Sequence, residues 1–211
     1  MPKKRPPPRP KDLRRAVLDA SLALAEEGGV GALSMREVAR RARVTHAAPY
    51  HHFADRAAIL AALAEEGFRL LTREMASAMA PIPRGDLARL EASAQAYFNF
   101  AMRHAAYMRV MFRPELAEPV SHPVVDAAAG EAMAVLIECV QECQFRKTLK
   151  KGDSLPIVLT LWATMHGLSS LWLDGPLCRL QNWHDSPDAL AELVAGTLRS
   201  WLEAANQTPA P

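Results

Sequence analysis

Sixteen prolines interrupt this 211-residue chain, and their positions constrain its fold more than any other feature. Five prolines lie within residues 2–10, two lie among the last three residues, and most of the others occupy short junctions. The stretches between the junctions are rich in Ala, Leu, Glu, Arg and Met, which favour helices, and they show no alternating strand pattern. Because proline is tolerated in or before a first helical turn, this spacing predicts an all-α protein.

Nine helices are expected from the spacing of the apolar residues and from the residues that start and stop helices. The first helix ends at the pair Gly28-Gly29, and two short helices follow before the longer ones. The expected helices cover residues 12–27, 34–42, 45–52, 55–80, 86–103, 105–113, 123–148, 156–173 and 187–204.

Charge is distributed unequally along the chain. Residues 1–56 carry 12 Lys and Arg against 6 Asp and Glu, whereas residues 57–211 carry 13 against 17. The basic N-terminal part favours a polyanionic partner, although a solvated, disordered tail would show the same charge.

The sequence lacks the residues that characterise several functional classes. Three cysteines without a secretory signal indicate the reduced thiols of a cytoplasmic protein, and no CxxC pair supports a zinc site. Cys139 and Cys143 lie one helical turn apart; we interpret them as buried packing residues and leave redox sensing open. Because no phosphate-binding loop or hydrolase motif occurs, the sequence predicts no enzyme, no metal site and no cofactor.

Residues 154–173 form an uncharged stretch of twenty residues, which is long enough to cross a bilayer. Threonine, serine, histidine and glycine residues dilute its hydrophobicity, and no aromatic belt with the usual basic flank accompanies it. We therefore expect no membrane span. The favoured interpretation is a helix buried between its own domain and a subunit interface.

Residues 34–56 read SMREVARRARVTHAAPYHHFADR and carry the signals of a helix-turn-helix. Ser34 and Glu37 form a capping box at the start of the first helix, and Val44 places an apolar side chain inside the turn. Thr45 is expected to cap the second helix, whose small and polar residues suit a close approach to base edges in the major groove. An ordinary helical hairpin is the alternative interpretation.

A wider set of residues around this motif matches a known family. These residues are Ala20, Leu24, Glu27-Gly28, Ser34 to Ala39, Ala42 to Thr45, Tyr50 to Phe53, Asp55-Arg56 and Leu60. Over Leu13–Leu63 the chain thereby resembles the N-terminal DNA-binding domain of TetR-family transcriptional regulators. In this reading His46 and Ala47 lie nearest the base edges. The residues expected near the phosphates are Arg36, Thr45, Tyr50, His52 and Arg56.

Two positions depart from the usual pattern of that family. Arg43 stands in the turn where the family usually has glycine, and a left-handed conformation there would cost an arginine about 1 kcal/mol. Pro49 lies inside the helix expected over 45–52, and it cannot donate a backbone hydrogen bond to Thr45. We expect local distortion of this helix and retention of the fold.

The C-terminal half carries a second resemblance, in the run Leu161-Trp162-Ala163-x2-His166-Gly167-Leu168. The run looks like the W-x3-H-G motif of the WHG subfamily of TetR ligand domains, and it places Trp162 and His166 on one helix face. An apolar effector cavity is implied, with His166 as a polar orienting group; the alternative is a core histidine satisfied by a neighbour. The expected lining residues are Tyr97, Tyr107, Met111, Met133, Trp162 and His166.

Taken whole, the sequence is expected to encode a homodimeric, cytoplasmic, TetR-like regulator. A three-helix domain over 12–56 would bind double-stranded operator DNA, and a helical bundle over 57–205 would bind the effector and dimerise through helices 156–173 and 187–204. Residues 1–11 would form a disordered basic arm, and residues 206–211 a disordered tail. We expect a repressor that a small apolar effector releases from DNA. An activator, a regulator without an effector, and a helical interaction module that no longer binds DNA are the alternatives.

Overall fold

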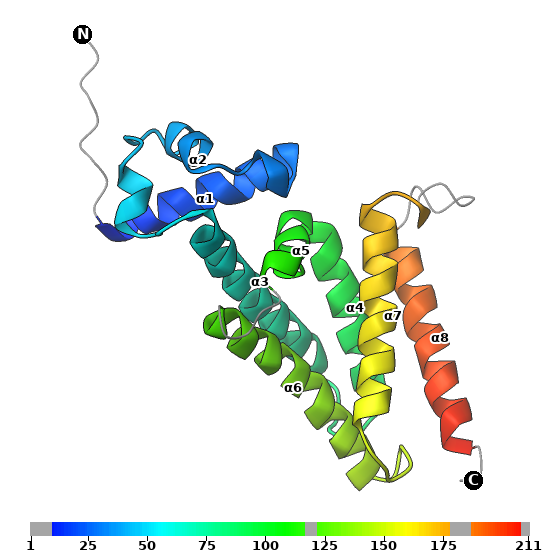
Figure 1. Ribbon diagram of the computed structural model, residues 1–211. Coiled ribbons are helices and arrows are strands. Elements are labelled where there is room, and N and C mark those ends of the chain that lie inside the picture. The colour runs from blue at the N-terminus through cyan, green and yellow to red at the C-terminus, as the bar shows by residue number, and fades with distance from the viewer. Residues whose placement is uncertain (1–9, 117–121, 178–186, 208–211) are drawn as a thin grey trace. The chain divides into compact units, whose positions relative to one another are not determined.

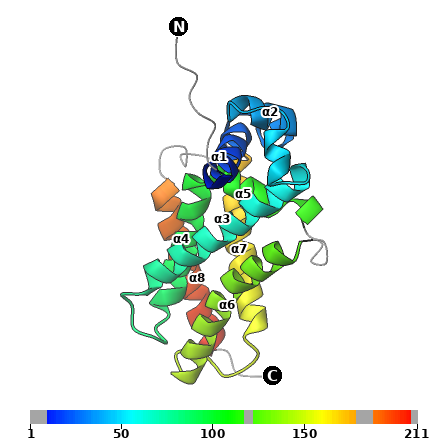
Figure 2. The ribbon, with the colours of Figure 1, turned by 90° about the vertical axis from the view of Figure 1, so that its left-hand side faces the viewer.

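The computed structural model describes residues 10–116, 122–177 and 187–207, and this part of the chain is all-α, as predicted (Figures 1 and 2). The basic arm and the tail that the sequence predicts lie almost entirely outside the described residues. In the described ranges, no helix combines the length and the apolar character needed to cross a membrane. The α-helices are α1 (Pro10–Gly28), α2 (Met35–Arg41), α3 (Arg56–Met79), α4 (Ala88–Arg103), α5 (Ala105–Met111), α6 (Pro123–Phe145), α7 (Leu155–Leu173) and α8 (Pro187–Gln207).

Two compact units divide the chain, and each is assembled from separate stretches of sequence. Unit 1 comprises the chain up to Gly67 together with Ala106–Ala127. Unit 2 comprises Phe68–Ala105 together with the chain from Ala128 onward. The boundaries fall inside α3 and α6 and directly after the first residue of α5 (Ala105), so α3 and α6 contribute substantially to both units. The functional division expected at residue 56 stays a prediction.

In unit 1, α1 packs against α2 and against two 3₁₀ helices, η1 (Val30–Ala32) and η2 (Ala48–His51). Figure 1 shows α1 and α2 as neighbours in blue. Helix α1 packs through an apolar face, on which Val17, Ala20 and Leu24 are all buried. Other buried side chains of this core are Leu33, Val38, Phe53, Ile59, Leu60 and Leu63.

The α-helix expected over 45–52 is wrong. A turn at His46 and Ala47 leads into η2, which is a 3₁₀ helix of only four residues. Pro49 has no N–H group with which to reach the Thr45 carbonyl as an α-helix requires, and Ala48 N donates to that carbonyl instead, at 3.0 Å. The described chain therefore contains eight α-helices instead of about nine, together with the 3₁₀ helices η1, η2 and η3 (Pro114–Leu116).

In unit 2, α4 packs against both α7 and α8, the three helices drawn in green, yellow and orange-red in Figure 1. Aromatic and long apolar side chains fill the space around α4. Those that are almost completely buried are Leu71, Met75, Leu90, Tyr97, Phe98, Phe100, Leu161 and Met165.

Helix α6 ends at Phe145, three residues before the end expected from the sequence. Lys147 lies in the left-handed region with φ 64°, its N–H donates to the Gln144 carbonyl, and the Thr148 N–H donates to the Cys143 carbonyl at 2.9 Å. This pair of hydrogen bonds is the Schellman motif, which usually places glycine at the left-handed position. Because a lysine stands there, no residue in the sequence marks the end of α6.

Candidate functional site

Helix α2 begins as its capping residue predicts. Ser34 has extended backbone angles, and its Oγ accepts a hydrogen bond from the Glu37 N–H at 3.3 Å. This bond satisfies one of the N–H groups that the first helical turn leaves free. Glu37 pairs through its side chain with Arg40, one turn further along the helix. The cap fixes where α2 starts and therefore where the following turn lies.

The turn after α2 is closed by backbone hydrogen bonds and contains a left-handed arginine. Ala42 N donates to the Val38 carbonyl at 2.8 Å, and Val44 N donates to the Ala39 carbonyl at 3.0 Å. Between them Arg43 has φ 57°, the conformation for which the family usually supplies glycine. The expected strain at this position is therefore present.

Five of the seven residues predicted to contact DNA lie in the short segment that follows. Thr45, His46 and Ala47 are all exposed, as is His52. The side chain of Tyr50 is 49% exposed, and its ring lies 5.9 Å from that of His46, centroid to centroid. Thr45 was expected to cap a helix, but the N-cap of η2 is Ala47, so the Thr45 hydroxyl stays available for another partner.

The cations around this segment differ in whether they already have a partner. Arg41 forms an ion pair with Glu27, which holds the pKa of that carboxyl below its usual range. Arg14 lies over the ring of Phe53. Arg36 is exposed, and within the described part of the chain its side chain has no hydrogen bond or ion pair, so its N–H groups can donate to a phosphate.

Arg56 occupies a different environment from the other predicted contacts. Its Nε donates to the Leu33 carbonyl at 2.8 Å, one terminal nitrogen donates to the Val30 carbonyl at 3.0 Å, and the other lies 3.2 Å from Glu115. Hydrogen bonds from Arg113 and Arg56 lower the pKa of Glu115. The guanidinium therefore holds the loop before α2 in place; its contact with DNA stays a prediction.

Three of the six residues predicted to line an effector cavity lie together in unit 2. The Tyr97 hydroxyl and His166 Nδ1 are 3.0 Å apart, and the rings of Trp162 and His166 are 6.5 Å apart, centroid to centroid. Burial raises the pKa of the Tyr97 phenol and lowers the pKa of the His166 imidazole, so both groups are neutral. A neutral, hydrogen-bonded polar pair in apolar surroundings can orient a small molecule.

The remaining three residues lie elsewhere. Tyr107 and Met111 belong to unit 1, where they pack on Gly67: a β-carbon there would lie 2.6 Å from the Met111 sulfur and 3.0 Å from a Tyr107 ring carbon. Met133 is half-buried in the part of α6 that belongs to unit 2. The cavity expected from these six residues stays a prediction.

Sequence reasoning missed Ser169, which lies three residues after His166 on α7. Ser169 is completely buried, and its Oγ has no hydrogen-bond partner among the described residues. A buried hydroxyl without a partner is uncommon in folded proteins. Its spacing of nearly one turn from His166 could have identified it as a further polar group near the Tyr97–His166 pair.

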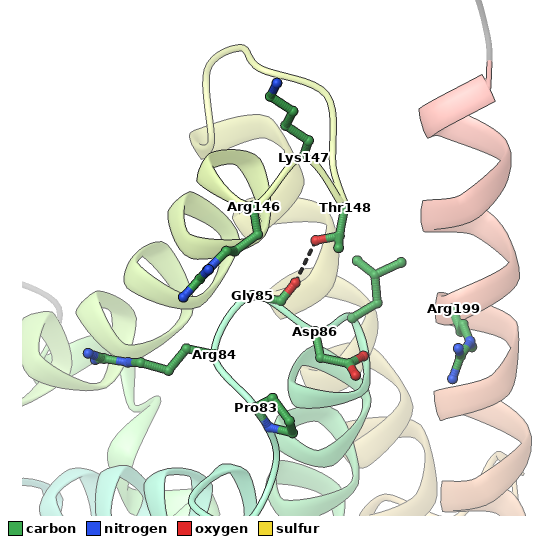
Figure 3. Close-up of a pocket in the computed structure, with 9 residues that line it drawn as sticks. Pro83, Arg84, Gly85, Asp86, Arg146, Lys147, Thr148 and Arg199 are labelled. Atoms are coloured by element: carbon green, nitrogen blue, oxygen red, sulfur yellow. Dashed lines mark hydrogen bonds between the residues drawn. The ribbon is translucent and has the colours of Figure 1, made fainter.

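A hollow of about 700 Å³ in unit 2, shown in Figure 3, was also not expected. The Thr148 hydroxyl donates to the Gly85 carbonyl at 2.6 Å and joins two of its walls. Two of its cations already have carboxylate partners, because Arg84 pairs with Glu142 and Arg199 with Glu91. Its lining residues are Pro83, Arg84, Gly85, Asp86, Leu87, Arg146, Lys147, Thr148 and Arg199.

The two cysteines on α6, Cys139 and Cys143, are both buried and form no disulfide within the described residues. The hydrogen bond with the neighbouring Cys143, together with burial, raises the pKa of the Cys139 thiol, which disfavours its reactive thiolate form. Over the part of the chain that the structure describes, no cluster of three or more potential metal ligands occurs.

Comparison with known proteins places these elements in a family. Residues 17–63 match the family described as "Bacterial regulatory proteins, tetR family", and residues 90–198 match "Tetracyclin repressor-like, C-terminal domain". A solved structure of a protein with unknown function from Rhodococcus sp. RHA1 is 33% identical, with a TM-score of 0.80 over 94% of this chain and 100% of that chain.

Two further relatives carry functional names. The HTH-type transcriptional repressor KstR of Rhodococcus jostii is 44% identical over 64 residues, so the match spans only 30% of that protein and 30% of this chain. The regulator FadR of Bacillus subtilis, solved in complex with stearoyl-CoA, shares the fold at 16% identity and a TM-score of 0.71, over 87% of this chain and 96% of that one. From the two family matches and the Rhodococcus structure, the chain belongs to the tetR family and is a DNA-binding transcriptional regulator, not an enzyme.

Proposed function

We propose that this regulator is a homodimeric repressor that an apolar small molecule releases from operator DNA. The observation that carries the proposal is the hydrogen-bonded Tyr97–His166 pair, because a completely buried tyrosine and a half-buried histidine supply a polar anchor among the largely apolar side chains of unit 2. The similarity to KstR, a protein named as a repressor, supports the direction of control. Residues 12–56 would bind DNA in the cytoplasm, and residues 57–205 would bind the effector and dimerise.

In the DNA-binding half of this proposal, His46 and Ala47 recognise the bases. Both are exposed, and the cations and hydroxyls expected at the phosphates flank them: Arg36, Thr45, Tyr50 and His52. Replacing His46 by alanine should cost about 1–3 kcal/mol of binding free energy and relax the preference at one base pair.

A matched control lies in η2, directly after the turn that holds His46. His51 is also an exposed histidine of this segment but is not among the predicted contacts. Fluorescence anisotropy on a duplex selected by the protein from a random pool should show a loss for His46→Ala and none for His51→Ala. Equal losses, or no loss in either, would contradict the assignment of base recognition.

For the effector we propose a long apolar chain, with a fatty acyl thioester as the first compound to test. The complex of FadR with stearoyl-CoA supports this choice through the shared fold, and the Trp162-x3-His166-Gly167 run supports a WHG-type ligand domain. The Tyr97 and His166 side chains would orient the polar end of the chain.

The effector test compares stearoyl-CoA with free CoA. Stearoyl-CoA at a hundredfold excess over its Kd should stabilise the protein by about 2.7 kcal/mol and release the selected duplex, whereas free CoA should do neither. Stabilisation without release would favour a regulator of another kind, and activation of transcription on binding would favour an activator.

The proposed dimer uses α7 and α8. Four apolar side chains of these helices are buried within the described chain: Leu161, Leu190, Val194 and Leu198. Large apolar side chains on the same helices remain exposed in the single chain, and these are the ones we assign to the interface. They are Leu155, Leu159, Leu171, Leu193 and Trp201.

Sedimentation tests the dimer directly. At micromolar concentration the chain of 23.1 kDa should sediment with twice its mass. The double variant Leu171→Glu, Leu193→Glu should be a monomer, because it places charges in an apolar interface. Val124→Glu, which changes an equally exposed apolar residue outside α7 and α8, should stay dimeric. A monomeric wild-type protein would overturn this part of the proposal.

A further inference from the structure

The turn after α2 holds a strained residue, and that residue is an arginine. Arg43 has φ 57°; among the non-glycine residues that the structure describes, only Lys147 also has a positive φ. A residue with a β-carbon adopts this conformation at a cost, because the β-carbon crowds the following carbonyl oxygen. Glycine adopts it freely.

No contact among the described residues explains why position 43 holds an arginine and not a glycine. The turn is closed by the N–H groups of its backbone, which glycine would supply equally well. The side chain of Arg43 is exposed, and it has no hydrogen bond or ion pair with any residue in the described ranges. The adjacent Arg40 and Arg41, by contrast, pair with Glu37 and Glu27. The strain at Arg43 is therefore not offset within the fold.

The position of Arg43 in the chain indicates which interaction could offset its backbone strain. The residue directly precedes Val44 and Thr45, at the start of the exposed segment to which we assign DNA contact. Arg36, on the helix before the turn, is likewise exposed and has no partner in the described chain. A guanidinium presents several donors in a plane and binds phosphate with two parallel hydrogen bonds.

We propose that Arg43 contacts a backbone phosphate of operator DNA, so that arginine in place of glycine increases affinity for DNA and lowers the stability of the free protein. The inference rests on the DNA-binding function and adds a contact that the helix-turn-helix motif itself does not supply. Because phosphates are the same in every sequence, this contact strengthens binding to all duplexes alike.

The test measures binding and stability of the full chain with Arg43→Gly. On a duplex selected from a random pool, the slope of log affinity against log salt should become shallower by about 0.9, the value for one lost phosphate contact. The scrambled duplex should lose affinity by the same factor. The melting temperature should stay the same or rise by about 2–4 °C, the shift expected when strain of this size is relieved. Arg43→Lys should keep the salt slope.

Lys147 provides the matched control. It is the second left-handed cation, and it lies at the hollow shown in Figure 3, outside the helix-turn-helix segment. Lys147→Gly should change the melting temperature as Arg43→Gly does and leave the salt slope unchanged.

An unchanged slope in Arg43→Gly, or an equal change in Lys147→Gly, would overturn the contact. A loss of affinity confined to the selected duplex would overturn it too, because it would mean that Arg43 reads bases. If the wild-type protein selected no duplex at all, the DNA-binding function itself would fail, and this outcome is distinct from the others.

Discussion

Each unit of the molecule contains an arginine that binds two backbone carbonyls of a connecting loop. In unit 1, Arg56 donates to the carbonyls of Val30 and Leu33. In unit 2, Arg89 donates to the carbonyls of Met79 and Ile82, both at 2.9 Å. In both cases the two carbonyls are three residues apart and lie where the chain leaves a long helix.

The neutralising carboxylates are arranged alike too. Glu115 pairs with Arg56 and with the exposed Arg113, whereas Glu142 lies 3.9 Å from Arg89 and pairs with the exposed Arg84. The two arginines differ in burial: the side chain of Arg56 is 36% exposed, and that of Arg89 is only 14% exposed.

Membership of a DNA-binding motif does not by itself decide what an arginine does. Arg56 lies within a DNA-binding motif, and Arg89 lies in no motif, yet each guanidinium donates to two backbone carbonyls: Arg56 through two of its nitrogens and Arg89 through one. A structural function therefore suffices to explain both arginines. The predictions below test whether burial decides how much each contributes to stability.

The largest effect is expected at Arg89. Arg89→Met takes the guanidinium donor from the Ile82 carbonyl and leaves the Met79 carbonyl with only the Ile82 N–H, and it removes a positive charge from beside the half-buried Glu142. The free energy of unfolding should fall by about 3 kcal/mol, as measured by urea denaturation. Arg84→Met, which removes the exposed partner of the same glutamate, should cost less than about 1 kcal/mol. Equal losses would mean that Glu142, and not the carbonyls, determines the stability of this region.

A smaller effect is expected at Arg56. Arg56→Met should lower the free energy of unfolding by about 2 kcal/mol, because charge-assisted hydrogen bonds are lost from a site that water reaches in part. Arg113→Met is the matched control at Glu115 and should cost less than about 1 kcal/mol. A salt titration of DNA binding adds a second measurement. If the slope of log affinity against log salt is shallower by about 0.9 in Arg56→Met, the predicted phosphate contact of Arg56 is supported.

The Tyr97–His166 hydrogen bond comes next in size. Tyr97→Phe removes only the hydroxyl from a completely buried ring, so the cost should be about 1 kcal/mol. A double-mutant cycle with His166→Phe should give a coupling energy of similar size in thermal unfolding. Independent effects of the two changes would show that the two side chains do not support each other.

The smallest effect is expected in the dependence of stability on pH. Burial lowers the pKa of His166 below its ordinary 6.5, so the unfolded chain binds this proton more readily than the folded one. Stability from this group is therefore complete above pH 6.5 and declines as the pH falls below it. Melting temperatures between pH 5 and 8 should show a decline that is weaker in His166→Gln than in the wild-type protein. Parallel curves for the two proteins would assign the decline to other groups.

Local signals in the sequence predicted the helix-turn-helix segment well. Ser34 caps α2 as expected, and the strain anticipated at Arg43 is present. Pro49 was expected to distort a helix and instead replaces it with a 3₁₀ helix, because the missing N–H falls within a segment too short to compensate. Signals of this kind act within a few residues, so they can be read without knowing the fold.

Contacts between distant residues could not be predicted in this way. The pairs Arg56–Glu115 and Tyr97–His166 join residues 59 and 69 positions apart, and no local pattern links their members. Helix α7 is apolar on most of its circumference, so its composition could not show which leucines face the core. Leu161 is buried and Leu171 is 46% exposed, and only the packed structure separates them.

The discontinuity of unit 1 affects the order in which the protein can fold during synthesis. Its N-terminal stretch ends at Gly67, but its second stretch ends only at Ala127, so 60 further residues must be made before all of its parts exist. At a rate of about 5–20 residues per second, this takes some seconds. Until then Arg56 lacks its partner Glu115, and Gly67 lacks the side chains of Tyr107 and Met111 that pack on it. The nascent DNA-binding segment therefore spends this interval without the contacts that complete it.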